Sequence, residues 1–188
     1  MKHYELVLLL NATLQEKERK DLISGLEKEI EGSILQKDDM GLLTIAHDLG
    51  EKKGNDKFYF VSYYLNADKN VTDTIKQFLL YNKVVYRYFL FGMNKTDEMF
   101  SFEKINEQMT KIIENWEEKK MGNKVTFFTK SENKKYISWK AIPMLKKYVT
   151  RFGNIKPRKY TGNAVNVQKT LRNTIIKARE IGVLEYIK

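Results

Sequence analysis

The side chains of this sequence that are best suited to chemistry are cations gathered between Tyr148 and Leu184. They are Lys156, Arg158, Lys159, Lys169, Arg172, Lys177 and Arg179. Fixed cations at such spacing can each displace a counterion from a phosphate chain, and arginine can hold two phosphate oxygens at once. The plainer alternative is a solvated, lysine-rich helix face, which many soluble helices carry.

Turn and cap signals predict how this stretch positions its cations. We expect Gly153 to close a preceding helix, and Pro157 to hold Lys156 in an extended, solvent-facing loop. Thr161 or Asn163 can cap the helix that follows. That helix is expected to bury one apolar face and to turn its basic residues to the sides and back. The expected buried residues are Val167, Leu171, Ile175 and Ala178.

The same stretch has a specific order of residue types beyond its charge. The run GNIKPRKYTG occupies positions 153–162, and the helix after it contains Gln168, Leu171 and the triplet Lys-Ala-Arg at 177–179. In this order and spacing, the region from about 127 to 186 resembles bacterial small-subunit ribosomal protein eighteen. The resemblance implies a small basic all-α module over 124–188 whose cations bind small-subunit ribosomal RNA.

Composition restricts the classes of function that are open to the chain. It has 188 residues with 42% hydrophobic content, no cysteine and two isolated histidines, His3 and His47. The absence of cysteine excludes disulfides and thiolate metal sites, and two separate histidines offer little to a metal or to general-base catalysis. No apolar run approaches the roughly 18 residues of a membrane span, and no signal-peptide pattern is expected. We therefore predict no enzyme activity, no catalytic residue, no cofactor, no metal and no membrane partner.

Charge is divided unevenly along the chain. Residues 1–118 carry 16 basic and 21 acidic side chains, a balance of −5, whereas residues 119–188 carry 18 and 3, a balance of +15. Opposite net charges favour contact between the two parts. The division predicts two modules that pack against each other within one chain.

Hydrophobic periodicity in the first 93 residues predicts the order β-α-β-β-α-β. The expected strands cover 4–10, 33–47, 58–65 and 84–92, and helical spacing is found over 14–30 and 71–79. Asn11 or Thr13 is expected to cap the first helix, and Asp68 or Thr72 to lie at the start of the second. A bulge or kink is expected at 38–41. This order is typical of an α+β, ferredoxin-like fold, with an antiparallel four-stranded sheet and both helices on one face.

Several residues in this part carry a second resemblance. The start reads Met-Lys-x-Tyr-Glu, and Gly41-Leu42-Leu43 is followed by Ala46 and then by an aromatic strand. Over residues 1–93 the chain resembles bacterial small-subunit ribosomal protein six, although Asp48 stands where that family usually has proline. The two families are ribosomal partners, so the pair of resemblances implies a fusion.

Such a fusion would be a structural constituent of the small ribosomal subunit, in the cytoplasm or in an organelle that encodes it. The resemblance implies that it binds 16S-type RNA at the central domain or platform, beside neighbouring small-subunit proteins. Together with scattered charge, it also places Lys2 and Arg87 near RNA.

Residues 94–123 are expected to form an amphipathic linker helix between the modules. Its stripe, capped by Ser101 and ended by Gly122, consists of Ile105, Met109, Ile112, Ile113 and Trp116. The stripe can dock on one of the two modules or in the groove of a separate partner. After it, Phe127 and Phe128 are expected to insert into an apolar site. The next helix should start near Ala141, which places Pro143 in its first turn.

Parts of the sequence are also compatible with three other functions. Phe58, Phe60, Val61 and Tyr63 could form the base-stacking sheet of a free-standing RNA-recognition module, or they could fill a core and a protein interface. Asp38-Asp39 with Asp48 could hold magnesium in a nucleic-acid enzyme, but acids in such a turn are usually solvated and no nucleophile accompanies them. The basic C-terminal helix could lie on a membrane, but its apolar face lacks Trp and Phe.

Overall fold

The computed structural model describes residues 2–13, 15–47, 49, 57–94, 97–118 and 127–186, without the side chains of 115–118. The chain forms two units, one made of Met1–Thr44 and Asn55–Met99, the other of Ile45–Gly54 and Phe100–Lys188. Each is described by itself. The predicted modules put residues 45–47 and 49 in the N-terminal part, whereas in the structure these residues group with the C-terminal unit.

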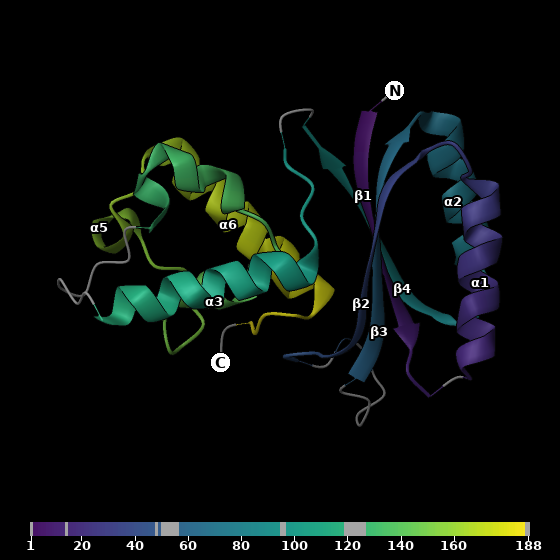
Figure 1. Cartoon of the computed structure of the whole chain (residues 1–188), viewed down its shortest axis with the longest axis horizontal. Helices are drawn as coiled ribbons and strands as arrows, with labels where there is room; N and C mark the ends of the chain where they lie inside the picture. Colours follow the sequence, from purple (N-terminus) through teal and green to yellow (C-terminus); the bar gives the residue numbers. More distant parts are fainter. Residues whose placement is uncertain are drawn as a thin grey trace. The chain divides into compact units, whose positions relative to one another are not determined.

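The N-terminal unit is an antiparallel sheet with two helices on one face (Figure 1). Its elements are β1 (Lys2–Asn11), α1 (Glu16–Glu29), β2 (Ile34–Thr44), β3 (Lys57–Ala67), α2 (Lys69–Leu80) and β4 (Val85–Met93). The strand order is β2-β3-β1-β4, with antiparallel pairing throughout. The ferredoxin-like order predicted from periodicity is confirmed.

The core of this unit lies between the sheet and its two helices. Alternate residues of β1 and β3 reach it because side chains along a strand point to opposite faces in turn. The residues at its centre are Leu6, Leu8, Leu10, Val61, Tyr63, Leu65, Leu22, Leu26, Ile75 and Leu79. Full burial of one such aliphatic side chain contributes about 1.5–3 kcal/mol. The apolar interior therefore provides most of what stabilises this unit.

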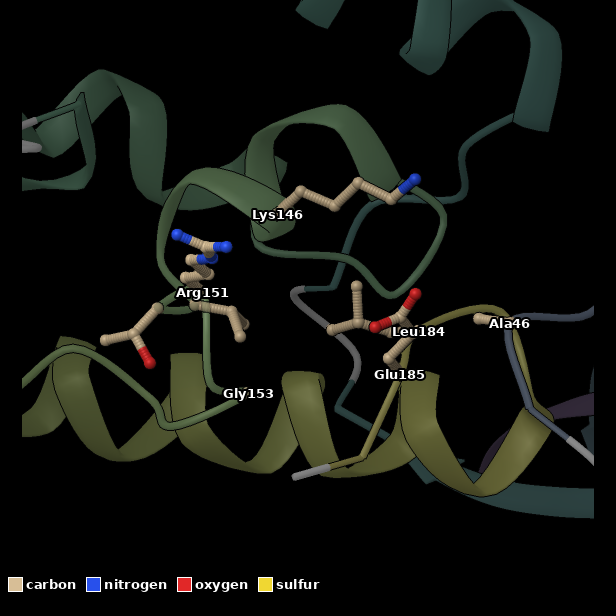
Figure 2. Close-up of a pocket in the computed structure, with 8 residues that line it drawn as sticks. Ala46, Lys146, Arg151, Gly153, Leu184 and Glu185 are labelled. Carbon is tan, nitrogen blue, oxygen red and sulfur yellow. The ribbon is translucent and has the colours of Figure 1, made fainter. Parts of the chain in front are cut away.

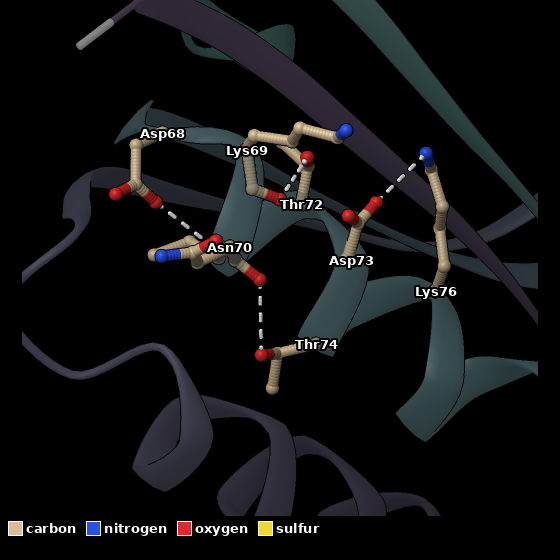
Figure 3. Close-up of polar contacts among 8 residues, drawn as sticks. Asp68, Lys69, Asn70, Thr72, Asp73, Thr74 and Lys76 are labelled. Carbon is tan, nitrogen blue, oxygen red and sulfur yellow. Dashed lines mark hydrogen bonds and ion pairs between the residues drawn. The ribbon is translucent and has the colours of Figure 1, made fainter.

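The two helices begin in different ways. Asp68, one of two residues predicted to lie at the start of α2, caps this helix, since its carboxylate accepts a hydrogen bond from the Val71 N–H at 3.0 Å (Figure 3). At α1 the cap position is Gln15, whose side chain makes no cap hydrogen bond. Asn11 instead accepts from the Thr13 N–H and hydroxyl at 3.3 and 2.9 Å. The predicted cap is wrong because an asparagine readily bonds the backbone two residues on and closes a turn before the helix starts.

The predicted irregularity in β2 is confirmed as a bulge. The pairing register with β3 shifts between Asp39 and Gly41, and Gly41 has a φ of 68°. The Asp39 carboxylate accepts from the Gly41 N–H at 3.1 Å and from the Tyr59 hydroxyl at 2.6 Å. Asp39 thus stabilises the bulge.

The C-terminal unit contains two long helices, α3 and α6, and several short ones. It contains α3 (Phe102–Glu118), η1 (Phe127–Thr129), η2 (Ser131–Tyr136), α4 (Ile142–Lys147), α5 (Arg158–Thr161) and α6 (Val165–Ile181). Helix α4 starts after Ala141 with Pro143 in its first turn, as predicted. Phe128 is fully buried and stacks on Tyr148 with ring centroids 5.0 Å apart, which confirms the predicted insertion for Phe128, whereas Phe127 is only half-buried.

Helix α3 docks on its own chain. Ile105 and Met109 from the predicted stripe are 1% and 0% exposed. Asn106 donates from its side-chain amide to the Lys140 carbonyl at 2.9 Å, and the buried Lys140 ammonium donates to the Phe100 carbonyl at 3.0 Å. These contacts hold α3 against the start of α4. The side chain of Trp116 and the predicted helix end at Gly122 lie outside the described residues.

The connection that follows β2 is a structural part of the C-terminal unit. Ile45 and Leu49 are buried there, and the Ala46 N–H donates to the Gly182 carbonyl at 2.7 Å. Gly182 ends α6 with a φ of 94°, and a Cβ at this position would lie 2.9 Å from Leu49 Cδ1. Glycine is needed here both for its backbone conformation and for the close approach of Leu49.

Candidate nucleic-acid interface

A tight hairpin forms the first part of the basic stretch, which runs from Tyr148 to Leu184. Val149 and Ile155 form a bridge, the Lys156 N–H donates to the Tyr148 carbonyl at 2.8 Å, and the Thr150 N–H donates to the Asn154 carbonyl at 2.8 Å. Gly153 has the positive φ that was predicted, 82°, but it does not close a helix. Helix α4 already ends at Lys147, because the chain turns back on itself and pairs as a hairpin instead.

The second part of the basic stretch is a single helical turn. Pro157 is extended, with φ −73° and ψ 165°, and its carbonyl accepts from the Tyr160 and Thr161 N–H groups at 2.9 and 3.2 Å. Gly162 ends the turn in the left-handed region with a φ of 65°. The segment expected as an irregular loop therefore holds Arg158 and Lys159 on the exposed turn α5.

A buried polar network ties this turn to α6. The Gln168 amide oxygen accepts from the Thr161 hydroxyl at 2.9 Å and from the Asn163 amide at 3.3 Å. The Gln168 amide nitrogen donates to the Lys156 carbonyl at 2.9 Å. The prediction that Thr161 or Asn163 caps α6 is wrong, since Ala164 occupies the cap position without a side-chain bond. A glutamine amide offers both a donor and an acceptor, and it engages both side chains.

Most of the predicted cations lie at the surface of their unit. Arg158, Lys159, Lys169 and Arg172 are exposed, and Lys156 and Lys177 are half-buried. Arg158 also donates from Nε to the Asn163 carbonyl at 3.0 Å, which fixes the base of its side chain. In the N-terminal unit, Lys2 on β1 and Arg87 on β4 are exposed, and the Arg87 guanidinium lies 5.9 Å from the Tyr86 ring centroid.

Arg179 is the exception, and its predicted place on the exposed cationic face is wrong. It is 6% exposed, donates from Nε to the Glu185 carbonyl at 3.0 Å, and donates from a terminal nitrogen to the Gly153 carbonyl. Burial lowers the pKa of Arg179. The sequence spacing already indicated this burial, because position 179 is four residues after Ile175 and lies on the same i, i+4 line as the buried face.

Two further cations were missed by sequence reasoning. Lys146 and Arg151 line a cleft of about 270 Å³ within the C-terminal unit, together with Val149, Leu184 and Glu185 (Figure 2). Figure 2 shows the Lys146 side chain extending above Leu184 and Glu185 in that view. The available signal was the lysine pair at the end of α4, where a helix C-terminus favours positive charge.

The described residues do not assemble the competing sites. Asp39 is engaged by the β2 bulge, Asp48 lies outside the described residues, and those described include no group of three or more potential metal ligands. Val61 and Tyr63 point into the sheet–helix core, so they do not share a sheet face with Phe58 and Phe60 as a base-stacking platform requires. In the described part of the chain, no helix has the length and apolar content of a membrane span.

Comparison with known proteins matches both parts of the chain. Residues 133–184 match the family model "Ribosomal protein S18", and residues 3–91 match "Ribosomal protein S6". The small ribosomal subunit protein bS18 of Mycoplasma capricolum is 40% identical over 68 residues, which cover 36% of this chain and 89% of that protein. That of Karelsulcia muelleri is 41% identical over 70 residues, 37% of this chain and 38% of that protein. These matches define a structural, non-enzymatic protein of the small ribosomal subunit.

The chain belongs to the S18 family through its C-terminal part. The S6 model matches residues 3–91 before it, and the two matches together support a fusion of an S6-like and an S18-like part. Its location is the small subunit of a cytoplasmic or organellar ribosome. Both resemblances noted in the sequence are confirmed. Among solved structures, the crystal structure of 30S ribosomal protein S6 from Thermotoga maritima matches with a TM-score of 0.44 and 17% identity, covering 60% of this chain and 97% of that chain.

Proposed function

We propose that this chain binds small-subunit ribosomal RNA, in the central domain or platform of a 16S-type molecule, through cations on α5, α6 and the residue before Pro157. The contacts are made by Lys156, Arg158, Lys159, Lys169, Arg172 and Lys177. Lys2 and Arg87 contribute weaker contacts from the N-terminal unit. Family membership supports RNA as the ligand, and the +15 balance of residues 119–188 supports a polyanion.

The observation that carries the proposal is the Gln168 network. It joins the backbone of Lys156 and the end of α5 to α6, so cations on two elements are held in a fixed arrangement before any ligand arrives. Less conformational freedom is then lost on binding, and a preformed site binds more tightly than a loop that must first be ordered. Arg179 acts as a positioning residue, because it holds the Gly153 carbonyl of the hairpin.

The test is the salt dependence of RNA binding by the full chain. Each alanine change among the six cations should weaken binding to a central-domain RNA fragment and flatten the slope of log affinity against log salt by somewhat less than one unit. Lys20→Ala is the matched control, since this exposed lysine on α1 pairs with Glu16. Slopes that stay at the wild-type value in all six variants would rule out the proposed contacts.

We propose further that the two modules pack against each other and against neighbouring small-subunit proteins. The −5 and +15 balances support this, as does the hydrogen bond from the Ala46 N–H, just after β2, to the Gly182 carbonyl. A protease site inserted between Glu98 and Met99 allows a test in the intact chain. After cleavage the fragments should sediment as one particle at low salt and separate more readily at high salt. Separation at every salt concentration would refute the packing.

A further inference from the structure

Two large aromatic side chains in the basic stretch face solvent. Phe152, in the turn of the hairpin, is 67% exposed, and Tyr160, on α5, is 52% exposed. Within the described part of the chain, neither ring stacks on another ring or lies over a cation, and neither belongs to the core. Their exposure therefore has no structural purpose inside the unit.

The charge around these rings distinguishes them from other exposed apolar residues. Single exposed aromatics are common on proteins and need no explanation. Phe152 and Tyr160, however, stand among Arg151, Lys156 and Arg158, and the sequence from 133 to 179 contains no aspartate or glutamate. Tyr81, which is 88% exposed in the N-terminal unit, has one cation, Lys83, within four positions in the sequence, whereas Phe152 has two and Tyr160 has three. Exposed rings within a run of sequence whose charged residues are all cations suit a ligand that has both flat faces and negative charge.

We propose that Phe152 and Tyr160 stack on unpaired RNA bases while the neighbouring cations hold the phosphates of the same strand. This inference rests on the proposed function and adds the form of the RNA: a loop, bulge or single strand. Bases inside an A-form duplex are stacked on one another and are not available to a protein ring, whereas unpaired bases stack well on Phe and Tyr.

The backbone under each ring is already fixed. Tyr160 lies on a helical turn closed by Gly162, and the turn is tied to α6 through Thr161 and Gln168. Phe152 lies in a hairpin whose Gly153 carbonyl accepts from Arg179. Rings on fixed backbone lose little freedom when a base stacks on them. A neighbouring protein is the rival occupant, but the run 133–179 has no acidic residue to pair with the basic side chains of a typical ribosomal protein, and the cleft beside Arg151 adds one carboxylate, Glu185.

The experiment compares two RNA probes that have the same phosphates and differ in their bases. One is an oligoadenylate of roughly 12 nucleotides, within the usual size of single-strand sites, and the other is the same strand with abasic sugars. The wild-type full chain should bind the oligoadenylate more tightly. Phe152→Leu with Tyr160→Leu should lower affinity for the oligoadenylate by about tenfold or more and leave the abasic strand and the salt slope unchanged.

Conservative and matched variants complete the design. Phe152→Tyr keeps a stacking ring and should retain affinity, and Tyr81→Leu should have no effect on either probe. The stacking proposal is overturned if the double variant binds oligoadenylate as wild type does, or loses equal affinity for both probes, since an equal loss means that the rings only shape the loop. Arg158→Ala tests the phosphate contacts separately. It should weaken the binding of both probes and flatten the slope of log affinity against log salt for each. If Arg158→Ala changes neither affinity nor salt slope while the double variant behaves as expected, the proposed phosphate contacts are wrong and the stacking proposal is still supported. Circular dichroism checks that each variant is folded.

Discussion

The two units of this chain are stabilised by different kinds of contact. In the N-terminal unit, leucines of β1 are fully buried against β3 and two helices, and its exposed cations take no part in that core. In the C-terminal unit, Lys140 and Arg179 are buried and donate to backbone carbonyls, and Gln168 joins three segments. In the second unit, residue types that suggest binding are therefore also structural, and a cation must be located before it is given a role.

The largest expected change in the stability of the C-terminal unit comes from removing the buried guanidinium of Arg179. Arg179→Leu leaves the Gly153 and Glu185 carbonyls without their donor, and we expect the C-terminal unit to lose about 3 kcal/mol. Hydrogen exchange should show lost protection in the hairpin and α6, with β1 and β3 unchanged. Leu8→Ala is the matched change in the other unit, where about 2–5 kcal/mol should be lost from the sheet core.

Arg179→Lys sharpens the same comparison. Lysine keeps the charge but has no planar fork with which to reach two carbonyls, so an intermediate loss is expected. If Arg179→Leu retained full protection in the hairpin, the structural role given to this residue would have to be abandoned.

A smaller effect is expected at the hairpin turn. Gly153→Val forces a branched residue into a φ of 82°, at a cost of roughly 1–2 kcal/mol, and should redirect the chain that enters Ile155. The control is Gly92→Ala on β4, a glycine without positive φ and with open space around its Cα. The melting temperature should fall by several degrees for Gly153→Val and hardly at all for Gly92→Ala. Equal melting temperatures for Gly153→Val and the wild-type chain would show that the turn tolerates a side chain.

The smallest effect on folding, with a clear effect on binding, is expected at Pro157. Its ring restricts Lys156 to extended conformations and lowers the freedom of the unbound segment. Pro157→Ala should leave helix content by circular dichroism nearly unchanged, reduce RNA affinity severalfold, and preserve the salt slope because no cation is removed. Unchanged affinity with a melting temperature many degrees lower would instead identify Pro157 as a stabilising core element.

Local patterns predicted the first unit better than the second. Four features depend mainly on neighbours within a few residues, and each was predicted: the apolar run of β1, the aromatic and β-branched run of β3, the irregularity at 38–41, and Asp68 at the start of α2. Asp68 succeeds because its partner, the Val71 N–H, is three positions away. The roles of Thr161 and Asn163 were missed because both side chains bond Gln168, a partner that competes with the helix start.

Contacts between distant positions were beyond any local pattern. The packing of Ala46 on Gly182 joins residues that are 136 positions apart, and nothing in the residue types near Ala46 indicates it. Arg179 is a different kind of failure: its position on the buried i, i+4 line was readable, but a charged residue was assumed to face out. Periodicity gives the angle around a helix, whereas the carbonyls that satisfy a buried guanidinium come from other parts of the fold.

The hydrogen bond from Ala46 to Gly182 also has a consequence for the order in which the nascent chain can fold. Synthesis proceeds from the N-terminus at roughly 5–20 residues per second, so Ala46 is made on the order of ten seconds before Gly182. Strands β3 and β4 follow Ala46 within that interval and can complete their sheet first. The segment after β2 must then wait for the end of translation, and any product released before residue 182 carries this segment without its partner.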